Sequence, residues 1–175
     1  MPPEIIYYVA CSLDGFIATE DGGVEWLEPF QKAGEDHGVA ELQSSADALL
    51  LGSKTYEFAL KLGAWPSPNT PSWVFTRREL KQLHPSITLT SRTPRQVVEL
   101  LKARGVKRAW LMGGGKLATS FRAEGLISSY IFIIMPIILG RGIPVLAAGG
   151  PQRSLVLESA KPFKSGIVQL IYKNG

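Results

Sequence analysis

The sequence is poor in the residues that carry thiol and imidazole chemistry. Of its 175 residues, one is cysteine, Cys11, and two are histidine, His37 and His84. A single thiol excludes an internal disulfide and any multi-thiolate zinc site. Neither histidine has a second ligand at metal-binding spacing, and no histidine lies near Cys11 in the sequence. We therefore expect no metal, no cysteine nucleophile and a reducing, cytoplasmic location.

Long hydrophobic segments are also missing. Residues 1–13 lack the basic start and the uninterrupted apolar core of a signal peptide. The most apolar run, residues 130–139, contains Pro136 and is much shorter than the roughly 20 residues that span a bilayer. We expect a core strand in this run and no membrane partner.

Charge of one sign is not concentrated in any part of the chain. The 19 Lys and Arg residues exceed the 15 Asp and Glu residues, which gives a net charge of +4. Only Arg77 with Arg78 and Lys107 with Arg108 are adjacent basic pairs. A scattered excess favours a small anionic ligand over a nucleic-acid partner. The length and the 45% hydrophobic content suit one domain over residues 1–175.

Strand-like and helix-like segments alternate through the first two thirds of the chain. The segments expected to be strands are residues 4–11, 16–18, 46–52, 73–75, 87–89, 108–112 and 127–139. Helices are expected over residues 36–45 and in the segments that begin at Ser53, at Pro94 after the cap Thr93, and at Lys116. Residues 154–163 and 166–172 alternate around a polar turn, which predicts a hairpin. We predict an α/β fold with a mostly parallel central sheet, helices on both faces and a C-terminal antiparallel hairpin.

Three successive glycines, Gly113, Gly114 and Gly115, stand between a predicted strand and a predicted helix. Glycine permits positive φ angles and lets a ligand approach the backbone closely. The free N–H groups at the start of a helix favour an anion such as phosphate. A plain turn is the alternative, although three glycines cost more conformational entropy than a turn requires.

Two further junctions follow predicted strands. Gly52 ends one strand and precedes Lys54 and Thr55, and Arg77 with Arg78 follows the next strand. A guanidinium matches phosphate well, although paired arginines equally suit a solvated helix start. Because the carboxyl ends of parallel strands meet at one edge of a sheet, we expect the three junctions to form one anion-binding edge.

The two common nucleotide-binding fingerprints do not fit these junctions. Gly113, Gly115 and Ala118 satisfy G-x-G-x-x-A, but residues 131–139 lack the acid that this motif needs about 20 residues further on. Lys116 is followed by a leucine where a P-loop has Ser or Thr.

Five motifs occur in a characteristic order along the chain. They are Ser12-Leu13-Asp14-Gly15-Phe16-Ile17-Ala18, Leu51-Gly52-Ser53-Lys54-Thr55-Tyr56-Glu57, Phe75-Thr76-Arg77-Arg78, Met112-Gly113-Gly114-Gly115-Lys116-Leu117 and Pro136-Ile137-Ile138-Leu139-Gly140-Arg141-Gly142-Ile143-Pro144. In these motifs the sequence resembles the dihydrofolate reductase-like superfamily, and more closely its bacterial branch named after the C-terminal domain of RibD, the riboflavin-biosynthesis deaminase-reductase. The resemblance covers nearly the whole chain and implies a dihydrofolate reductase-like three-layer fold that binds NADPH in an extended form.

The resemblance also implies which residues would contact NADPH. These are Gly52, Lys54 and Thr55 for the pyrophosphate, Thr76, Arg77 and Arg78 for the 2′-phosphate, Gly113, Gly114, Gly115, Lys116 and Leu117 for the pyrophosphate and nicotinamide side, and Ala10 and Ile17 for the nicotinamide pocket. Lys54 departs from the arginine that the family often has, which would replace a forked donor by a point charge. A chain with one cysteine cannot carry the zinc signature of the deaminase half of RibD.

The resemblance implies NADPH-dependent hydride transfer to a C=N or C=O bond of a small pterin-, pyrimidine- or carbonyl-type substrate. Asp36, followed by Glu35, is the leading candidate for a proton-donating helix carboxylate, because a partly buried carboxyl with a raised pKa could supply the proton. Stabilisation of a helix N-terminus is the alternative role for each acid. Asp14 could contact substrate, but Asp before Gly favours a turn.

Two other functions fit the same residues. One is a non-catalytic nucleotide- or pterin-binding protein with this fold, because no catalytic acid is compelling. The other is a structural protein that uses residues 131–139 at a homodimer contact.

Overall fold

The computed structural model describes residues 1–31, 34–61, 63 and 65–175, and it confirms the predicted fold class. The main sheet contains β1 (Glu4–Ser12), β3 (Ala48–Gly52), β4 (Ser72–Phe75), β5 (Ile87–Thr90), β6 (Arg108–Gly113), β7 (Ser129–Met135), β9 (Leu155–Pro162) and β10 (Val168–Asn174). A small second sheet pairs β2 (Phe16–Ala18) with β8 (Ile143–Pro144). The helices are the 3-10 helix η1 (Glu25–Leu27), α1 (Glu28–Gln31), α2 (Val39–Ser45), α3 (Ser53–Lys61), α4 (Pro94–Ala103) and α5 (Gly115–Ala123).

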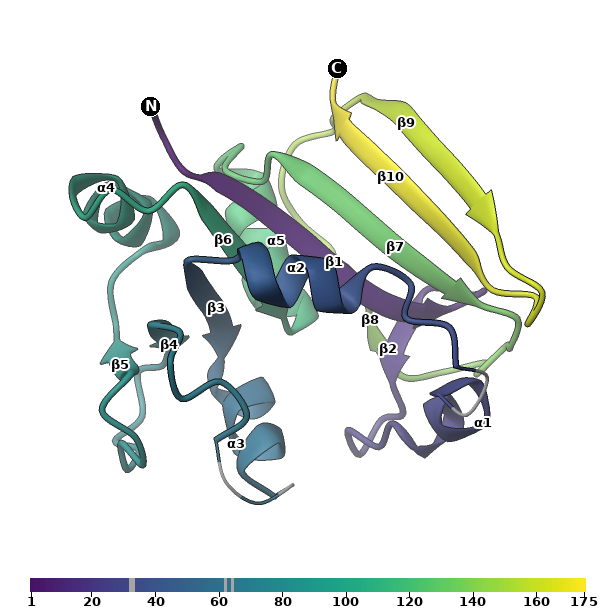
Figure 1. Cartoon of the computed structure of the whole chain (residues 1–175), viewed down its shortest axis with the longest axis horizontal. Helices are drawn as coiled ribbons and strands as arrows, with labels where there is room; N and C mark the ends of the chain where they lie inside the picture. The colour runs from purple at the N-terminus through teal and green to yellow at the C-terminus, as the bar shows by residue number, and fades with distance from the viewer. Residues whose placement is uncertain (32–33, 62, 64) are drawn as a thin grey trace.

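The main sheet has the strand order β5-β4-β3-β6-β1-β7-β10-β9 (Figure 1). The pairings from β5 through β7 are all parallel, whereas β10 runs antiparallel to β7 and β9 runs antiparallel to β10. The predicted parallel sheet and C-terminal hairpin are therefore both present. All the parallel strands present their carboxyl ends at the same edge, where ligands gather in sheets of this kind.

Helices cover both faces of the sheet. Successive residues of a strand point to opposite faces. On β1, Tyr7 joins the buried cluster that contains side chains of α4 and α5, whereas Tyr8 joins the cluster that contains Leu42 of α2. Trp110 packs against the cluster that contains Leu42 of α2 and also against a cluster that contains Tyr56 of α3. The helices α2 and α3 therefore cover the same face of the sheet. Figure 1 shows α2 in front of the sheet and α5 behind it.

Two elements differ from their predicted bounds by more than two residues at one end, each for a local reason. The expected helix over residues 36–45 begins at Val39, because Gly38 adopts a left-handed φ of 86° and the Asp36 carboxylate caps the helix from outside. The expected strand over residues 127–139 covers only Ser129–Met135, because Pro136 has no N–H to donate to a neighbouring strand. The short elements η1, α1 and β8 had no clear signal in the sequence.

β7 lies inside the sheet and hydrogen-bonds to β1 on one side and β10 on the other. Its strand edges are therefore not open to a second copy of the chain. Over the part of the chain that the structure describes, every helix is too short or too polar to cross a bilayer.

Candidate functional site

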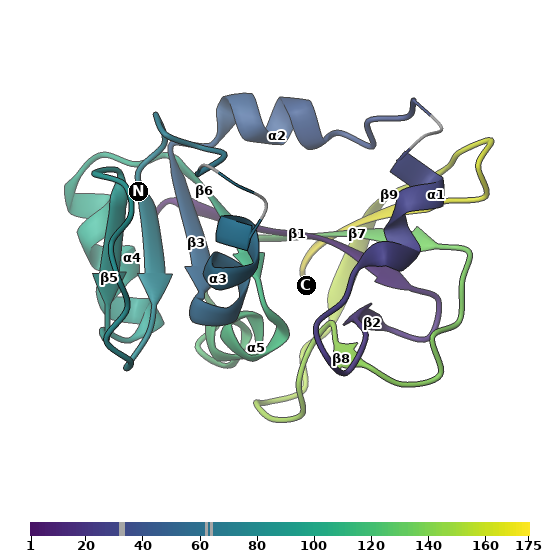
Figure 2. The same ribbon diagram turned by 90° about the horizontal axis from the view of Figure 1, so that it is seen from below.

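The three predicted junctions lie together at the carboxyl edge of the sheet. β3 pairs in parallel with β4 on one side and with β6 on the other, so their carboxyl ends are neighbours. Figures 1 and 2 show α3 and α5 starting at this edge, from the ends of β3 and β6. We call residues 52–55, 76–78 and 113–117 the junction edge. The predicted convergence of these segments is confirmed.

Glycines keep side chains out of the middle of the junction edge. A Cβ atom on Gly52 would lie 3.8 Å from both Gly113 O and Gly114 N. A Cβ atom on Gly114 would lie 3.8 Å from Thr55 Oγ1 and 4.0 Å from Ile17 Cδ1. Gly113 has a φ of 96°, which side-chain-bearing residues rarely adopt, and its peptide bond to Gly114 is cis. Three segments, residues 52–55, residues 113–114 and Ile17 of β2, thus meet around a small space.

The start of α5 offers backbone donors to this space. The N-cap is Gly114, which has no side chain to cap the helix. The N–H of Ala118 donates to Gly114 O, so the preceding N–H groups of Gly115, Lys116 and Leu117 have no acceptor within the helix. Such donors, at the positive end of the helix dipole, suit a phosphate oxygen.

The basic residues of the junction edge are not equivalent. The Arg78 guanidinium donates to both carboxylate oxygens of Glu57 on α3, with Nη1–Oε1 3.2 Å and Nη2–Oε2 2.7 Å. This contact lowers the pKa of Glu57, and Lys54 adds to the effect. The hydroxyl of Thr76 is 2.9 Å from the N–H of Arg78, from which it accepts. Arg77 is exposed and forms no ion pair within the described ranges. Of these two adjacent arginines, Arg77 is therefore the one without a carboxylate partner among the described residues.

The pair β2 and β8, which we call the β2–β8 ribbon, packs against the start of α5. A Cβ atom on Gly115 would overlap the carbonyl oxygen of Pro144 on β8. The buried Tyr7 hydroxyl donates to Val145 O at 2.6 Å, which fixes the residue that follows β8. The sequence offered no signal for this packing, because β8 is only two residues long and its partner is distant along the chain.

A cavity of about 310 Å³ adjoins β1 on the α2 face, and we call it the smaller cavity. Ala10, predicted to line the nicotinamide pocket, lines it together with Glu35 and Asp36. The rest of its wall is mainly apolar and includes Phe30 and Met135. The structure thus brings both predicted acids and one predicted nicotinamide contact to one cavity.

Asp36 forms contacts that support its alternative role at a helix start. Its carboxylate accepts from the N–H of Gly38 at 3.1 Å and from the N–H of Ala40 at 3.1 Å. These bonds satisfy donors that the first turn of α2 leaves without partners. The proposed acid role of Asp36 stays a prediction.

Glu35 is held by the β9–β10 turn. Its carboxylate accepts from the Ser165 hydroxyl, and Oε2 lies 3.5 Å from Nε2 of His37. That separation is too long for a strong hydrogen bond and becomes an ion pair when the imidazole is protonated. The Ser165 hydrogen bond, followed by the His37 contacts, lowers the pKa of Glu35. These contacts oppose the raised pKa that a proton donor needs, and the acid role of Glu35 stays a prediction.

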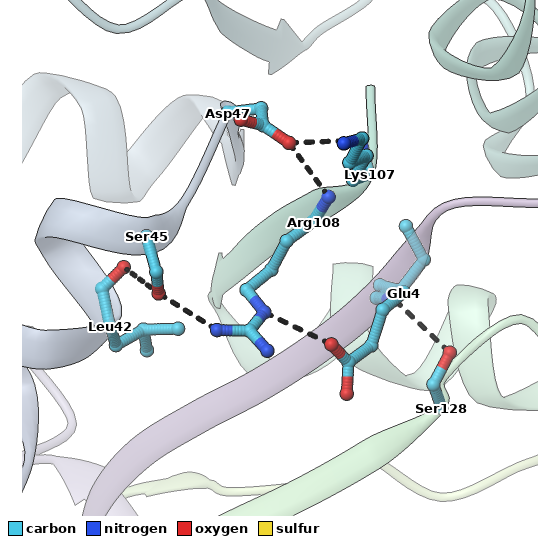
Figure 3. A network of polar contacts seen from close by, with 8 residues as sticks. Glu4, Leu42, Ser45, Asp47, Lys107, Arg108 and Ser128 are labelled. Atoms are coloured by element: carbon cyan, nitrogen blue, oxygen red, sulfur yellow. Dashed lines mark hydrogen bonds and ion pairs between the residues drawn. The ribbon is translucent and has the colours of Figure 1, made fainter. Parts of the chain in front are cut away.

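A larger cavity, of about 560 Å³, also lies on the α2 face. Of the predicted site residues, only Asp36 lines it. Its wall includes Glu4 and Arg108 from the amino ends of two strands, and the Arg108 guanidinium there contacts Glu4 Oε2 at 3.0 Å and Ser45 Oγ at 3.0 Å (Figure 3). The junction edge and the smaller cavity together contain every predicted site residue except Ile17, which lies beside Gly114, so they form the candidate site.

The chain matches a known protein family along most of its length. The family model described as the RibD C-terminal domain matches residues 3–169. The uncharacterized protein YwjB of Bacillus subtilis (strain 168) is 32% identical over 173 residues, which cover 98% of each chain.

Solved structures share the fold over the full length of this chain. A Shewanella sp. PV-4 protein whose name refers to riboflavin biosynthesis has a TM-score of 0.89 at 24% identity, with 100% of this chain and 99% of that chain covered. The diaminohydroxyphosphoribosylaminopyrimidine deaminase/5-amino-6-(5-phosphoribosylamino)uracil reductase of Thermotoga maritima has a TM-score of 0.75 at 18% identity. The match covers 99% of this chain and 57% of that protein. The resemblance seen in the sequence motifs is confirmed at the level of family and fold.

Proposed function

Since the chain belongs to the RibD C-terminal domain family, we propose that it is an NADPH-dependent reductase. The proposed reaction transfers a hydride to a C=N or C=O bond of a small pterin-, pyrimidine- or carbonyl-type substrate. The observation that carries the proposal is the junction edge, where three junctions suited to anions follow neighbouring strands. The next strand, β1, pairs with β6 and carries Ala10, which lines the smaller cavity.

The residues of the junction edge fit a dinucleotide with separate phosphate groups. The N–H groups at the start of α5 and the side chains of Lys54 and Thr55 would hold the pyrophosphate. Arg77, which has no carboxylate partner within the described residues, would hold the 2′-phosphate beside Thr76. NADPH, when bound, would supply the hydride, and the protein would position it and exclude water.

The smaller cavity is the proposed substrate site. Its volume of about 310 Å³ lies at the lower limit of ordinary ligand pockets, which suits a single small ring system. Its apolar walls would exclude water from the reacting atoms, and Ala10 leaves space on β1 for a flat ring. Asp36 remains the proposed proton donor, with the helix cap as its competing role.

A second candidate function rests on the contacts of the two acids. Both carboxylates are engaged inside the protein, Asp36 by α2 and Glu35 by Ser165. This engagement favours a protein that binds a nucleotide or pterin without turning it over. Consumption of NADPH with a panel of pterins, pyrimidines and carbonyls distinguishes the two functions, because steady turnover lost in Asp36→Asn supports the reductase.

Fluorescence titration with NADPH and NADH tests the cofactor assignment. We expect NADPH to bind more tightly than NADH, and we expect the difference to disappear in the double variant Arg77→Ala/Arg78→Ala. Equal affinity for the two dinucleotides in the wild-type protein contradicts the assignment of Arg77 to a 2′-phosphate.

A further inference from the structure

We propose that Asp14 is a positioning residue for the cofactor site, because its carboxylate holds the β2–β8 ribbon in place against the start of α5. The inference rests on the proposed function in one respect: NADPH is taken as the ligand, and the affinity for NADPH shows whether the ribbon is in place. Asp14 acts through other residues and is not placed in contact with the cofactor.

The Asp14 carboxylate joins two loops that are far apart in the sequence. Oδ1 accepts from the Ser12 hydroxyl at 2.6 Å and from the N–H of Leu139 at 3.1 Å, and Oδ2 accepts from the N–H of Gly140 at 2.7 Å. The hydrogen bond from Ser12 and those from the two backbone N–H groups lower the pKa of Asp14. The carboxylate is therefore ionised at neutral pH and ties the β1–β2 turn to the loop after β7.

The two tied loops lead directly into the β2–β8 ribbon. Phe16 on β2 pairs with Pro144 on β8, and the N–H of Val145 donates to Gly15 O at 2.9 Å. A Cβ atom on Gly142 would overlap the carbonyl oxygen of Ala18, so the two chains are in close contact here. A clamp at Asp14 thus joins the turn that leads into β2 to the loop that leads into β8, and so holds the two strands of the ribbon together.

The other side of the ribbon borders the junction edge. The carbonyl oxygen of Pro144 fills the space that a side chain on Gly115 would need, and Ile17 lies beside Gly114. Movement of the ribbon would therefore move Ile17, the predicted nicotinamide contact, away from the glycine turn. Since the ribbon has only five residues in strand conformation, the pairing between β2 and β8 alone gives it little stability.

The contacts of Asp14 also favour a structural role over a contact with substrate. Its two carboxylate oxygens accept three hydrogen bonds from within the protein. Most of the roughly four acceptor positions of the carboxylate are thus occupied within the protein. The turn predicted at Asp14 from the sequence is present, but the tie to Leu139 and Gly140 was not foreseeable, because those residues follow it by 125 and 126 positions.

The chain offers a matched control in Asp47. Like Asp14, it accepts from two successive backbone N–H groups, those of Lys107 at 2.9 Å and Arg108 at 3.0 Å, and these bonds lower its pKa (Figure 3). Asp47 lies at the amino ends of the strands, at the opposite edge from the cofactor site. Asp14→Asn and Asp47→Asn therefore make the same chemical change at opposite edges of the sheet.

The experiment compares the two variants by NADPH titration and by hydrogen exchange. We expect Asp14→Asn to weaken NADPH binding about tenfold, which corresponds to about 1.4 kcal/mol, and Asp47→Asn to leave it within about twofold. We also expect backbone amides of residues 139–145 to exchange faster in Asp14→Asn alone. Unchanged affinity in folded Asp14→Asn, or an equal loss in both variants, overturns the inference.

Two additional outcomes keep the inference separate from the proposed function. If the wild-type protein binds no NADPH, the proposed function fails, but the clamp can still be tested. Faster amide exchange confined to Asp14→Asn then supports the clamp, and exchange at the wild-type rate in Asp14→Asn overturns it. If Asp14→Asn does not fold, Ser12→Ala replaces it, because it removes the hydroxyl that donates to Asp14 and accepts from the N–H of Phe16 at 3.0 Å. The same faster exchange is expected in Ser12→Ala, and wild-type exchange there overturns the clamp.

Discussion

The unequal environments of two neighbouring arginines lead to a prediction about cofactor selectivity. Arg78 is bound through both of its terminal nitrogens to Glu57, so the charge of this pair is largely cancelled. Arg77 is exposed and pairs with no carboxylate in the part of the chain that the structure describes. We predict that Arg77→Ala weakens NADPH binding and leaves NADH binding unchanged. The paired substitution Glu57→Gln/Arg78→Gln, which leaves the net charge unchanged, should affect neither dinucleotide by more than about threefold.

The expected loss in Arg77→Ala follows from the charge and exposure of the site. A phosphate monoester carries about −1.5 to −2 charges at neutral pH. One pair of unit charges about 4 Å apart contributes about 1 kcal/mol in water and about 4 kcal/mol at an effective dielectric constant of about 20. Because Arg77 is exposed, we take the lower end, about 1–2 kcal/mol, which corresponds to about a tenfold increase in the NADPH dissociation constant.

The assay is fluorescence titration at low and at high salt. Lys102→Ala, a change of equal charge on the remote helix α4, is the control for a nonspecific electrostatic effect. The tenfold loss should shrink at high salt because exposed charges are screened. An equal loss for NADH, or a loss no larger than in Lys102→Ala, refutes the assignment of Arg77 to the 2′-phosphate.

The described contacts lead to four other predictions. Gly115→Ala should lower the free energy of unfolding by about 1–3 kcal/mol in urea titration, because its Cβ overlaps a β8 carbonyl. Gly52→Ala, whose Cβ makes ordinary 3.8 Å contacts, should keep that stability and weaken NADPH binding. Glu35 has a lowered pKa in the folded protein, so the stability it contributes is present above the ordinary glutamate pKa of 4.5. That stability is lost as the pH falls through the pKa of Glu35 in the folded protein. In Glu35→Gln, the free energy of unfolding should therefore depend less on pH in this acidic range. Asp36→Asn should abolish turnover with unchanged NADPH affinity if Asp36 donates the proton, whereas a cap role alone predicts only a stability loss of about 0.5–2 kcal/mol in thermal unfolding.

Much of the fold was predictable because local signals and the global pattern agree. Thr93 and Pro94 predicted the start of α4, and the structure shows a full capping box there with Gln96. Apolar runs ended by glycine predicted β3 and β6, and their parallel pairing brought Gly52 next to Gly113. The junction edge could be foreseen because parallel strands must end on the same side of a sheet.

The parts that could not be predicted depend on contacts between distant residues. The Arg78–Glu57 pair joins positions 21 residues apart in the sequence, and the contact of Asp14 with Gly140 spans 126. Neither distance leaves a periodic signal in the sequence. The roles of Glu35 and Asp36 were also open, because adjacent acids before a helix suit both capping and catalysis until their partners are known.

Titration of the ¹⁵N-labelled protein with NADPH, followed by amide NMR spectra, locates the bound dinucleotide on this 19.1 kDa chain. Binding at the junction edge predicts that the largest shifts occur in residues 52–55, 76–78 and 113–117, with smaller shifts in the β2–β8 ribbon. Shifts confined to the larger cavity, at residues such as Glu4 and Arg108, or an unchanged spectrum at saturating NADPH, contradict the assignment of the junction edge as a dinucleotide site.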